Sequence, residues 1–331
     1  MRSRPNADDP RLGEMSEARI LEAILSRTLP SVHTILGPGD DAAVIAAPSG
    51  SVVATTDTLV HGPDFRLAWS TGYDLGWKAA AVNLADVAAM GARPTALLVA
   101  LAVPRDLRLS FVEQLADGFR EACASLAPGC AVVGGDLTVT DVLTVAVTAL
   151  GDLEGRAAVT RSGARPGDVI AVAGELGQAA WGLGVLFGRF RDGDTPIPVN
   201  DGMLTHDESA AVAAQLRPEP PIGLGPVAAA AGATAMMDIS DGLALDARRM
   251  ATASAVTFAL DSAALGGDPE RALAGGEDHA LLATFPMESV PIGFRIIGEV
   301  RARREHELVC DERPIDVSGW DPYRDWDSVV G

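Results

Sequence analysis

Cysteine and long apolar runs are scarce in this sequence, and their scarcity excludes several classes of protein. The three cysteines, Cys123, Cys130 and Cys310, are odd in number and lack metal-site spacing, so we expect buried, reduced thiols rather than disulfides or a catalytic cysteine. The longest apolar stretch, residues 95–103, is too short to span a bilayer. The first ten residues contain no apolar segment of the secretory type, so the sequence predicts a cytoplasmic protein with no membrane partner.

Positive charge is also scarce. Lys and Arg number 26 against 45 Asp and Glu, which gives a formal net charge of −19. Nucleic acids are bound by clustered Lys and Arg, so this balance argues against a nucleic-acid partner. The positions of the acidic residues therefore carry most of the information about function.

The signatures of several common catalytic sites are missing as well. The sequence contains no Walker A lysine motif, no G-x-G-x-x-G after a first strand, no G-x-S-x-G and no H-E-x-x-H. Its five histidines form no cluster at zinc-ligand spacing. We therefore expect chemistry that uses no covalent nucleophile on the protein.

Length and local pattern predict two domains of mixed α/β (α+β) structure. A chain of 331 residues is long enough to bury two cores of ordinary size. Helical and strand patterns alternate, and we expect a flexible tail at 1–12, an N-terminal domain at 13–152 and a C-terminal domain at 153–331. Pro, Gly and Asp are frequent between 189 and 206, which predicts a mobile loop there.

Aspartates that follow predicted strands or lie in glycine turns are the most informative feature. A predicted strand at 51–56 ends on Thr-Thr-Asp, one at 131–133 runs into Gly-Gly-Asp, and one at 233–237 ends on Asp-Ile-Ser-Asp. Any single one has an ordinary alternative role, since Asp in a glycine turn commonly bonds its own backbone. Mg²⁺ prefers carboxylate oxygens, so the recurrence of the pattern predicts a site where Mg²⁺ ions bind phosphate groups.

Asp86 differs from the others because it lies on a predicted helix, 73–90, that is otherwise apolar. An unpaired carboxylate buried on such a helix is strongly destabilising. Two interpretations are open at this stage: Asp86 pairs with Lys78 or Arg93, or it binds a metal ion.

Seven motifs, in this order, resemble the thiamine-monophosphate kinase family, whose superfamily includes aminoimidazole ribonucleotide synthetase and selenophosphate synthetase. The motifs run through nearly the whole chain: Gly39–Ala43, Thr56–Val60, Asn83–Leu101, Gly134–Asp136, Thr160–Asp168, Asp238–Leu243 and Gly275–Asp278. The resemblance implies a two-domain aminoimidazole-ribonucleotide-synthetase-like fold, with mixed sheets flanked by helices and the active site in the cleft between the domains. It also implies a homodimer whose N-terminal sheets pack together.

The resemblance further implies an activity and a set of site residues. The family transfers the γ-phosphate of ATP to the phosphate of thiamine monophosphate, which gives thiamine diphosphate and ADP. Several Mg²⁺ ions would be held by Asp41, Thr55, Thr56, Asp57, Asp86, Asp136, Asp238 and Asp241. ATP would contact Gly135, Asp136, Arg161 and Ser240, and the thiamine moiety would contact Glu277 and Trp320. The acceptor phosphate is already anionic near neutral pH, so we expect no general base.

The acceptor site departs from the family pattern at one important position. Asp64 stands where the family usually has a histidine that touches the substrate. Three explanations are open: Asp64 contacts the positively charged thiamine, His61 folds back into the site, or the acceptor is a different molecule. Two smaller departures are Ala85 in place of serine and His279 in place of tyrosine.

Three other functions compete with this interpretation. A kinase of the same superfamily could act on another phosphorylated small molecule. A Mg²⁺-dependent phosphohydrolase would use similar carboxylates to activate water. A non-catalytic nucleotide- or metal-binding regulator is the third, and the retention of all the acidic positions argues against it. Selenophosphate synthetase is disfavoured because no cysteine precedes the loop at Gly39.

Overall fold

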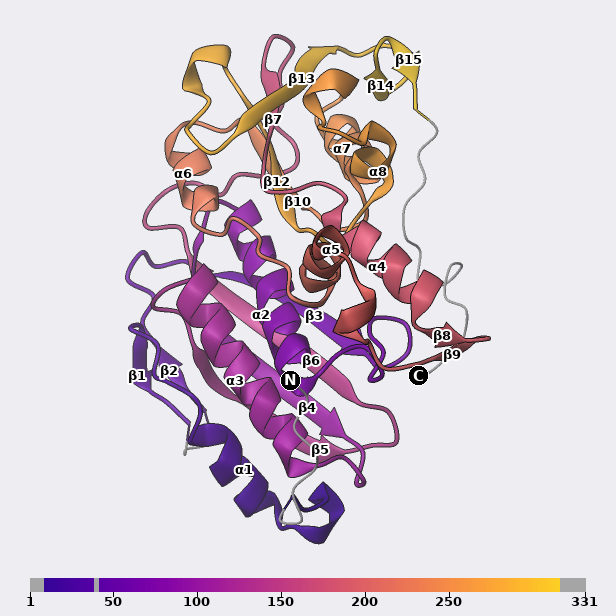
Figure 1. The fold of residues 1–331 in the computed structure, drawn as a ribbon. Coiled ribbons are helices and arrows are strands. Elements are labelled where there is room, and N and C mark those ends of the chain that lie inside the picture. The colour runs from indigo at the N-terminus through magenta and orange to yellow at the C-terminus, as the bar shows by residue number, and fades with distance from the viewer. Residues whose placement is uncertain (1–8, 39–41, 316–331) are drawn as a thin grey trace.

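Two mixed sheets, each packed against helices, form the lower and upper parts of the molecule (Figure 1). The structure is a computed structural model that describes residues 9–38 and 42–315. Asp41 and Trp320, both predicted to be site residues, lie outside the described residues.

The first sheet has four strands in the order β3-β6-β4-β5. Their bounds are β3 (Val53–Val60), β4 (Arg93–Val103), β5 (Val132–Val139) and β6 (Thr144–Asp152). Helices α2 (Gly72–Ala89) and α3 (Leu109–Leu126) cover one face and form a core with it. The chain that precedes these elements contains η1 (Leu12–Glu14), α1 (Glu17–Leu25), β1 (Thr34–Leu36) and β2 (Val44–Ile45).

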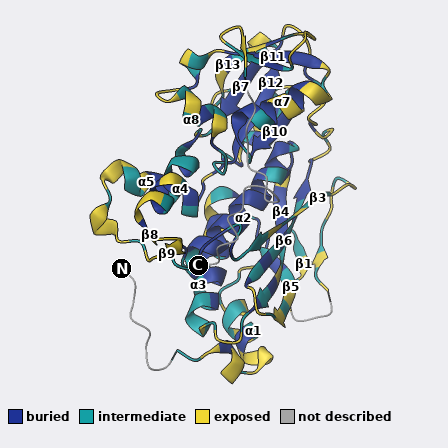
Figure 2. Cartoon of the chain, turned by 90° about the vertical axis from the view of Figure 1, so that its right-hand side faces the viewer, coloured by how far each residue is buried: buried dark blue, intermediate teal, exposed yellow. Residues whose placement is uncertain are grey.

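Helix α2 is buried along almost its whole length, which accounts for its apolar sequence (Figure 2). It begins with a capping box, in which Thr71 Oγ1 accepts a hydrogen bond from the Asp74 N–H and the Asp74 carboxylate accepts one from the Thr71 N–H. A helix buried in this way leaves its few polar side chains little access to bulk water. Lys78, Asn83 and Asp86 must therefore find partners in the structure around them.

The second sheet has seven strands in the order β10-β12-β7-β13-β11-β14-β15. Their bounds are β7 (Val169–Ala173), β10 (Ala235–Ile239), β11 (Val256–Leu260), β12 (Ala280–Phe285), β13 (Arg295–Ala302), β14 (Leu308–Cys310) and β15 (Arg313–Pro314). Helices α6 (Leu224–Ala230), α7 (Leu243–Ala253) and α8 (Pro269–Ala274) accompany this sheet, and α7 shares a core with it. Helices α4 (Gln178–Arg189) and α5 (His206–Leu216) pack on each other, and α5 also contacts α2.

Four local predictions differ from the structure. The strand predicted at 233–237 is β10 at Ala235–Ile239, so it continues through Asp238. The strand predicted at 51–56 continues through Asp57, and the strand predicted at 131–133 continues through Asp136. Both aspartates therefore lie inside strands, because the alternating residues that follow each one still pair with a neighbouring strand. The predicted loop at 189–206 contains a small hairpin, β8 (Arg191–Asp192) with β9 (Thr195–Pro196), and a 3-10 helix, η2 (Asp201–Met203).

The last residues of the predicted tail at 1–12 are among the described residues, and they contact the first domain. The Asp9 carboxylate accepts a hydrogen bond from Ser110 Oγ at 2.6 Å, and Leu12 is buried. The domain boundary after residue 152 stays a prediction, although β6 ends there. No helix in the described part of the chain is long and apolar enough to cross a membrane.

Candidate active site

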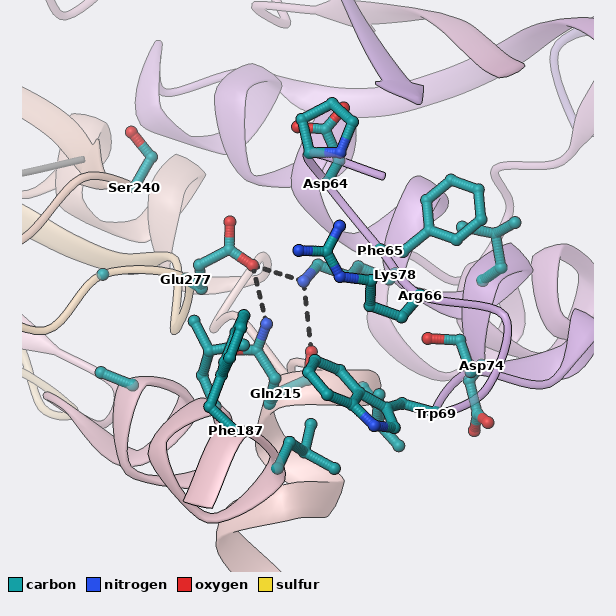
Figure 3. A pocket seen from close by; sticks show the side chains of 18 of the residues that line it. Asp64, Phe65, Arg66, Trp69, Asp74, Lys78, Phe187, Gln215, Ser240 and Glu277 are labelled. Atoms are coloured by element: carbon teal, nitrogen blue, oxygen red, sulfur yellow. Dashed lines mark hydrogen bonds and ion pairs between the residues drawn. The ribbon is translucent and has the colours of Figure 1, made fainter. Parts of the chain in front are cut away.

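A cavity of about 650 Å³ lies between α2 and the elements of the second half of the chain (Figure 3). One wall consists of the segment that follows β3 and the first turns of α2. The opposite wall consists of α4, α5 and two loops, which carry Ser240 with Asp241 and Gly276 with Glu277. These loops lie close together, because a Cβ added at Gly276 would be 2.3 Å from the Ser240 carbonyl oxygen.

Three carboxylates meet close to this cavity, where β3, α2 and β10 come together. Asp86 accepts a hydrogen bond from Thr55 Oγ1 at 2.8 Å, which ties the helix to the strand. The Asp57 N–H donates to Asn83 Oδ1 at 3.1 Å, which is a second tie between the same elements. The third carboxylate, Asp238, is buried near the end of β10.

Burial and neighbouring negative charge destabilise the ionised forms of Asp86 and Asp57. Burial, together with the charges of Asp238 and Asp57, raises the pKa of Asp86 to about 7. Burial also raises the pKa of Asp57, a rise that His279 opposes and Asp238 increases. Among the described residues, no group of three acidic, histidine or cysteine side chains is placed to hold a metal ion as it stands. A divalent cation drawn between these carboxylates would relieve their repulsion.

The loop before β12 brings His279 to this cluster. The ring Nδ1 of His279 lies 3.1 Å from Asp238 Oδ2. Burial alone would lower the pKa of His279, but the hydrogen bond to Asp238 and the charge of that carboxylate raise it above its ordinary value. Glu277 and His279 have φ values of 71° and 53°, a left-handed conformation that is unfavourable for residues other than glycine and is often found at functional sites.

Asp278, which lies between them, anchors helix α4. Its Oδ1 accepts a hydrogen bond from the Ala179 N–H at 2.8 Å, in the first turn of α4. A carboxylate at a helix N-terminus satisfies free N–H groups and interacts favourably with the helix dipole. Asp278 thereby fixes α4 against the loop that carries Glu277.

Lys78 and Glu277 form an ion pair in the middle of the cavity wall (Figure 3). The sequence offered Lys78 and Arg93 as possible partners of Asp86, and both predictions are wrong. Lys78 pairs with Glu277, and Arg93 pairs with Glu154 at 2.8 Å. Asp86 was predicted to be a site residue because a charged side chain is unusual on an apolar helix. The same reasoning could have identified Lys78 as a site residue.

Asp64 lines the same cavity. Its Oδ2 accepts a hydrogen bond from the Val60 N–H at 2.7 Å, and burial raises the pKa of its carboxyl group. Trp69 and Phe187 also line the cavity, with their rings edge to face at a centroid distance of 4.9 Å. Sequence reasoning missed both, because α4 and the segment before α2 meet only in the folded chain.

The turn after β10 places Ser240 and Asp241 at the cavity. Both of their N–H groups donate to the buried Asp246 carboxylate, at 3.1 and 3.0 Å, which fixes the turn. The Asp241 carboxylate pairs with Arg249 of α7. The predicted nucleotide contact Arg161 is an exposed residue in the loop before β7, where its carbonyl accepts a hydrogen bond from Ser254 Oγ at 3.0 Å.

Thr56 and Asp136 lie on the opposite face of the first sheet from the carboxylate cluster. Thr56 alternates with Thr55 and Asp57, and its hydroxyl donates to the Val147 carbonyl at 2.9 Å. Residues paired directly across strands lie on the same face of a sheet. Thr58, on the same face as Thr56, pairs with Ala146 of β6. Ala146 pairs with Ala100 of β4, and Ala100 pairs with Asp136 of β5, so Asp136 lies on this face too. Three strand spacings separate β3 from β5, so Asp57 and Asp136 are roughly 14 Å apart. Within one chain, Asp136 does not join the cluster.

A second cavity, of about 680 Å³, lies at the β5 edge of the first sheet. Gly135 and Asp136 line it, together with residues of α1. Pro38 and Ala42, which lie next to the undescribed residues 39–41, line it too. Pro38 and Ala42 therefore lie near the Gly-Gly-Asp motif.

Comparison with known proteins identifies the family. Residues 39–153 match the family described as AIR synthase related protein, N-terminal domain. The thiamine-monophosphate kinase of Mycobacterium tuberculosis strain H37Rv is 38% identical over 341 residues, 97% of this chain and 96% of the relative. That of Corynebacterium glutamicum is 39% identical over 332 residues, 95% of each chain.

Solved structures give the same result. A structure described as AaThiL complexed with AMPPCP and TMP is 32% identical, has a TM-score of 0.73 and covers 95% of this chain and 99% of its own. The hydrogenase maturation protein HypE in complex with ATP is 19% identical with a TM-score of 0.66, covers 87% of each chain, and so shares the fold alone. The AIR-synthase-like fold expected from the motifs is confirmed. The chain belongs to the thiamine-monophosphate kinase family.

Proposed function

We propose that this protein transfers the γ-phosphate of ATP to thiamine monophosphate in a Mg²⁺-dependent reaction that releases thiamine diphosphate and ADP. One observation carries the proposal: buried carboxylates that repel one another lie near a cavity lined in part by aromatic side chains. The family supports it, and so does the similar structure described as complexed with AMPPCP and TMP.

The chain's own residues prepare the metal end of the site. Asp57, Asp86 and Asp238 would hold Mg²⁺, with Asp241 as a further ligand once it leaves Arg249. Bound Mg²⁺ would neutralise charge on the phosphate oxygens of both substrates, which otherwise repel each other. Thr55 orients Asp86, and His279 orients Asp238, through the hydrogen bonds described above. Ser240 and Arg161 would contact the nucleotide, and no side chain is needed to deprotonate the acceptor phosphate.

The other end of the cavity suits the thiamine moiety. Its thiazolium ring is a cation, and Asp64 places a carboxylate in the cavity wall. The rings of Trp69 and Phe187 add an aromatic surface, on which a cationic ring can stack. Trp320, predicted to contact thiamine, stays a prediction because it lies outside the described residues.

The proposal includes a homodimer, because two predicted site residues face away from the cavity. Thr56 and Asp136 are exposed on the open face of the first sheet, as are Thr58 and Ala100. If two copies pack these faces together, Asp136 and Gly135 of one subunit would serve the site of the other. Light scattering should give a dimer for the wild type, and Ala100→Glu, which places a charge in that face, should weaken it. A cytoplasmic location remains part of the proposal.

The decisive experiment is an assay of purified protein with ATP, Mg²⁺ and thiamine monophosphate. We expect thiamine diphosphate and ADP in equal amounts. ADP and free phosphate without the diphosphate product would indicate a phosphohydrolase, and nucleotide binding without turnover would indicate a regulator. ADP formation only with other phosphorylated acceptors would indicate a different kinase of the superfamily.

The metal site is tested with Asp57→Asn. This variant should lose nearly all turnover while its melting temperature in EDTA stays at or above that of the wild type, because the substitution removes a metal ligand and a buried negative charge. Asp106→Asn, at an exposed aspartate after β4, is the matched control and should keep full activity. Near-normal turnover by Asp57→Asn would contradict the proposed metal site.

A further inference from the structure

The Glu277 carboxylate is held through only one of its two oxygens (Figure 3). Lys78 Nζ donates to Oε2, and Gln215 Nε2 donates to the same Oε2 at 3.2 Å. The two donors belong to different elements, α2 and α5. Among the described residues, no donor contacts Oε1. Two donors from different directions fix the plane of the carboxylate, so the direction in which Oε1 points is also fixed.

The same three residues form a closed unit. Lys78 Nζ also donates to the backbone carbonyl of Gln215 at 3.3 Å, so the lysine holds both the carboxylate and the helix that carries the second donor. The Gln215 amide group has only one workable orientation here, because its NH₂ group must face the carboxylate. Lys78 is deeply placed, with 7% of its side chain exposed, whereas 41% of the Glu277 side chain is exposed. Lys78 is therefore buried on the protein side of the ion pair, and Glu277 is the partner that is open to the cavity.

The charge of the unit indicates which ligand group it suits. Burial alone would raise the pKa of Glu277, but the charges of Lys78 and His279 and the two hydrogen bonds hold it below its ordinary value. Glu277 therefore stays ionised, and Oε1 is a strong acceptor. Its charge is already balanced by Lys78, so a neutral N–H donor suits Oε1 better than a cation does. Asp64, on the other wall of the cavity, is the carboxylate that suits the cationic thiazolium ring.

We propose that Lys78 and Gln215 are positioning residues, which fix Glu277 so that its Oε1 accepts a hydrogen bond from an N–H donor on the heteroaromatic end of the acceptor. This inference rests on the proposed function, in which the acceptor is thiamine monophosphate. The pyrimidine ring of that molecule carries an amino group, which supplies the donor.

Calorimetric binding tests the inference without relying on turnover. Thiamine monophosphate is compared with its 4′-oxo analogue, oxythiamine monophosphate, in the presence of Mg²⁺ and a non-hydrolysable ATP analogue. The wild type should bind the amino form roughly tenfold more tightly, because the oxo group presents a lone pair to Oε1 instead of an N–H. Lys78→Met and Gln215→Met should reduce this preference to about twofold or less, since a hydrogen bond to a freely rotating carboxylate discriminates weakly. Lys78→Arg should retain most of it.

Arg217→Met is the matched control. Arg217, just after α5, pairs with Asp74 of α2, so its loss removes an ion pair between the same two parts of the molecule without touching Glu277. Lys78→Met and Arg217→Met should lower the melting temperature to a similar degree, but Arg217→Met should keep the tenfold preference. A preference retained in Lys78→Met, or lost equally in Arg217→Met, would overturn the inference. A wild type that does not distinguish the two ligands would overturn it too.

The two proposals fail in different ways. A wild type that prefers the amino ligand through Lys78 but forms no thiamine diphosphate would support the positioning role and contradict the proposed reaction. A wild type that forms thiamine diphosphate but shows no dependence of the preference on Lys78 would do the reverse.

Discussion

Asp86 is a carboxylate whose ionisation opposes folding when no metal is bound. Its pKa of about 7, raised by burial and by the charges of Asp238 and Asp57, lies well above the ordinary value of 3.8. Between these two values the folded protein binds more protons than the unfolded chain, so the stability of the metal-free protein falls as the pH rises through this range. Mg²⁺ competes with the proton for the same oxygens, so its affinity should rise over the same range.

The prediction is that the melting temperature in EDTA falls more steeply between pH 5 and pH 8 for the wild type than for Asp86→Asn. The asparagine cannot ionise, and the slope that remains should come from the other groups. Saturating Mg²⁺ should raise the wild-type melting temperature more at pH 8 than at pH 5. Parallel curves for the two proteins in EDTA would mean that Asp86 does not titrate in this range.

At the same scale, the sequence identified residues whose chemistry conflicts with their local surroundings. Asp86 was found because a carboxylate is out of place on an apolar helix, and Lys78 could have been found by the same rule. Gln215, Trp69 and Phe187 could not, because nothing in their local sequence distinguishes them from ordinary residues. Their role depends on the contact between distant parts of the chain, which local pattern does not contain.

Among the elements, helices α2 and α3 approach each other very closely. A Cβ added at Gly76 of α2 would be 2.1 Å from the Leu115 carbonyl oxygen of α3. Real Cβ atoms cannot come so near a backbone oxygen, so the helices would have to move apart. Because α2 carries Lys78 and Asp86, its position also determines the geometry of the site.

Gly76→Ala should therefore destabilise the protein by about 1–3 kcal/mol or more, as overpacked cores do. Gly184→Ala is the matched control, since Gly184 is an exposed helical glycine of α4 with open space around its Cα. There the substitution should stabilise by about 0.5–1 kcal/mol, because alanine favours the helix. Urea denaturation of both variants measures the difference, and equal effects at the two positions would contradict the close approach of the helices.

Element prediction succeeded where an apolar run was bounded by turn residues. The helix expected at 73–90 is shifted by one residue from α2. It failed at β3, β5 and β10, where aspartate was taken to end the strand. Strand pairing in the sheet overrides the low β-propensity of a single aspartate, and that pairing is not visible in local sequence.

At the scale of the whole molecule, the strand ends predicted at the aspartates concealed the face of the sheet on which each residue lies. Once β3 is extended to Val60, alternation puts Thr55 and Asp57 on one face of the sheet and Thr56 on the other. The motifs were known in sequence, but the face each residue occupies follows only from strand register. Within one chain, the carboxylates near the cavity therefore lie apart from the Gly-Gly-Asp motif, which is on the open face.

In the proposed dimer, the carboxylates near the cavity of one subunit and the Gly-Gly-Asp motif of the other serve the same site. Dimers that combine two different variants test this arrangement. If Asp57 of one subunit and Asp136 of the other serve the same site, Asp57→Asn and Asp136→Asn homodimers should both be inactive. In a mixed dimer, one site would lack both aspartates and the other would keep both. Random exchange makes half of the dimers mixed, so co-expression should restore about a quarter of the wild-type activity. If each site used both aspartates of one chain, every site in the mixture would be defective, and no activity would return.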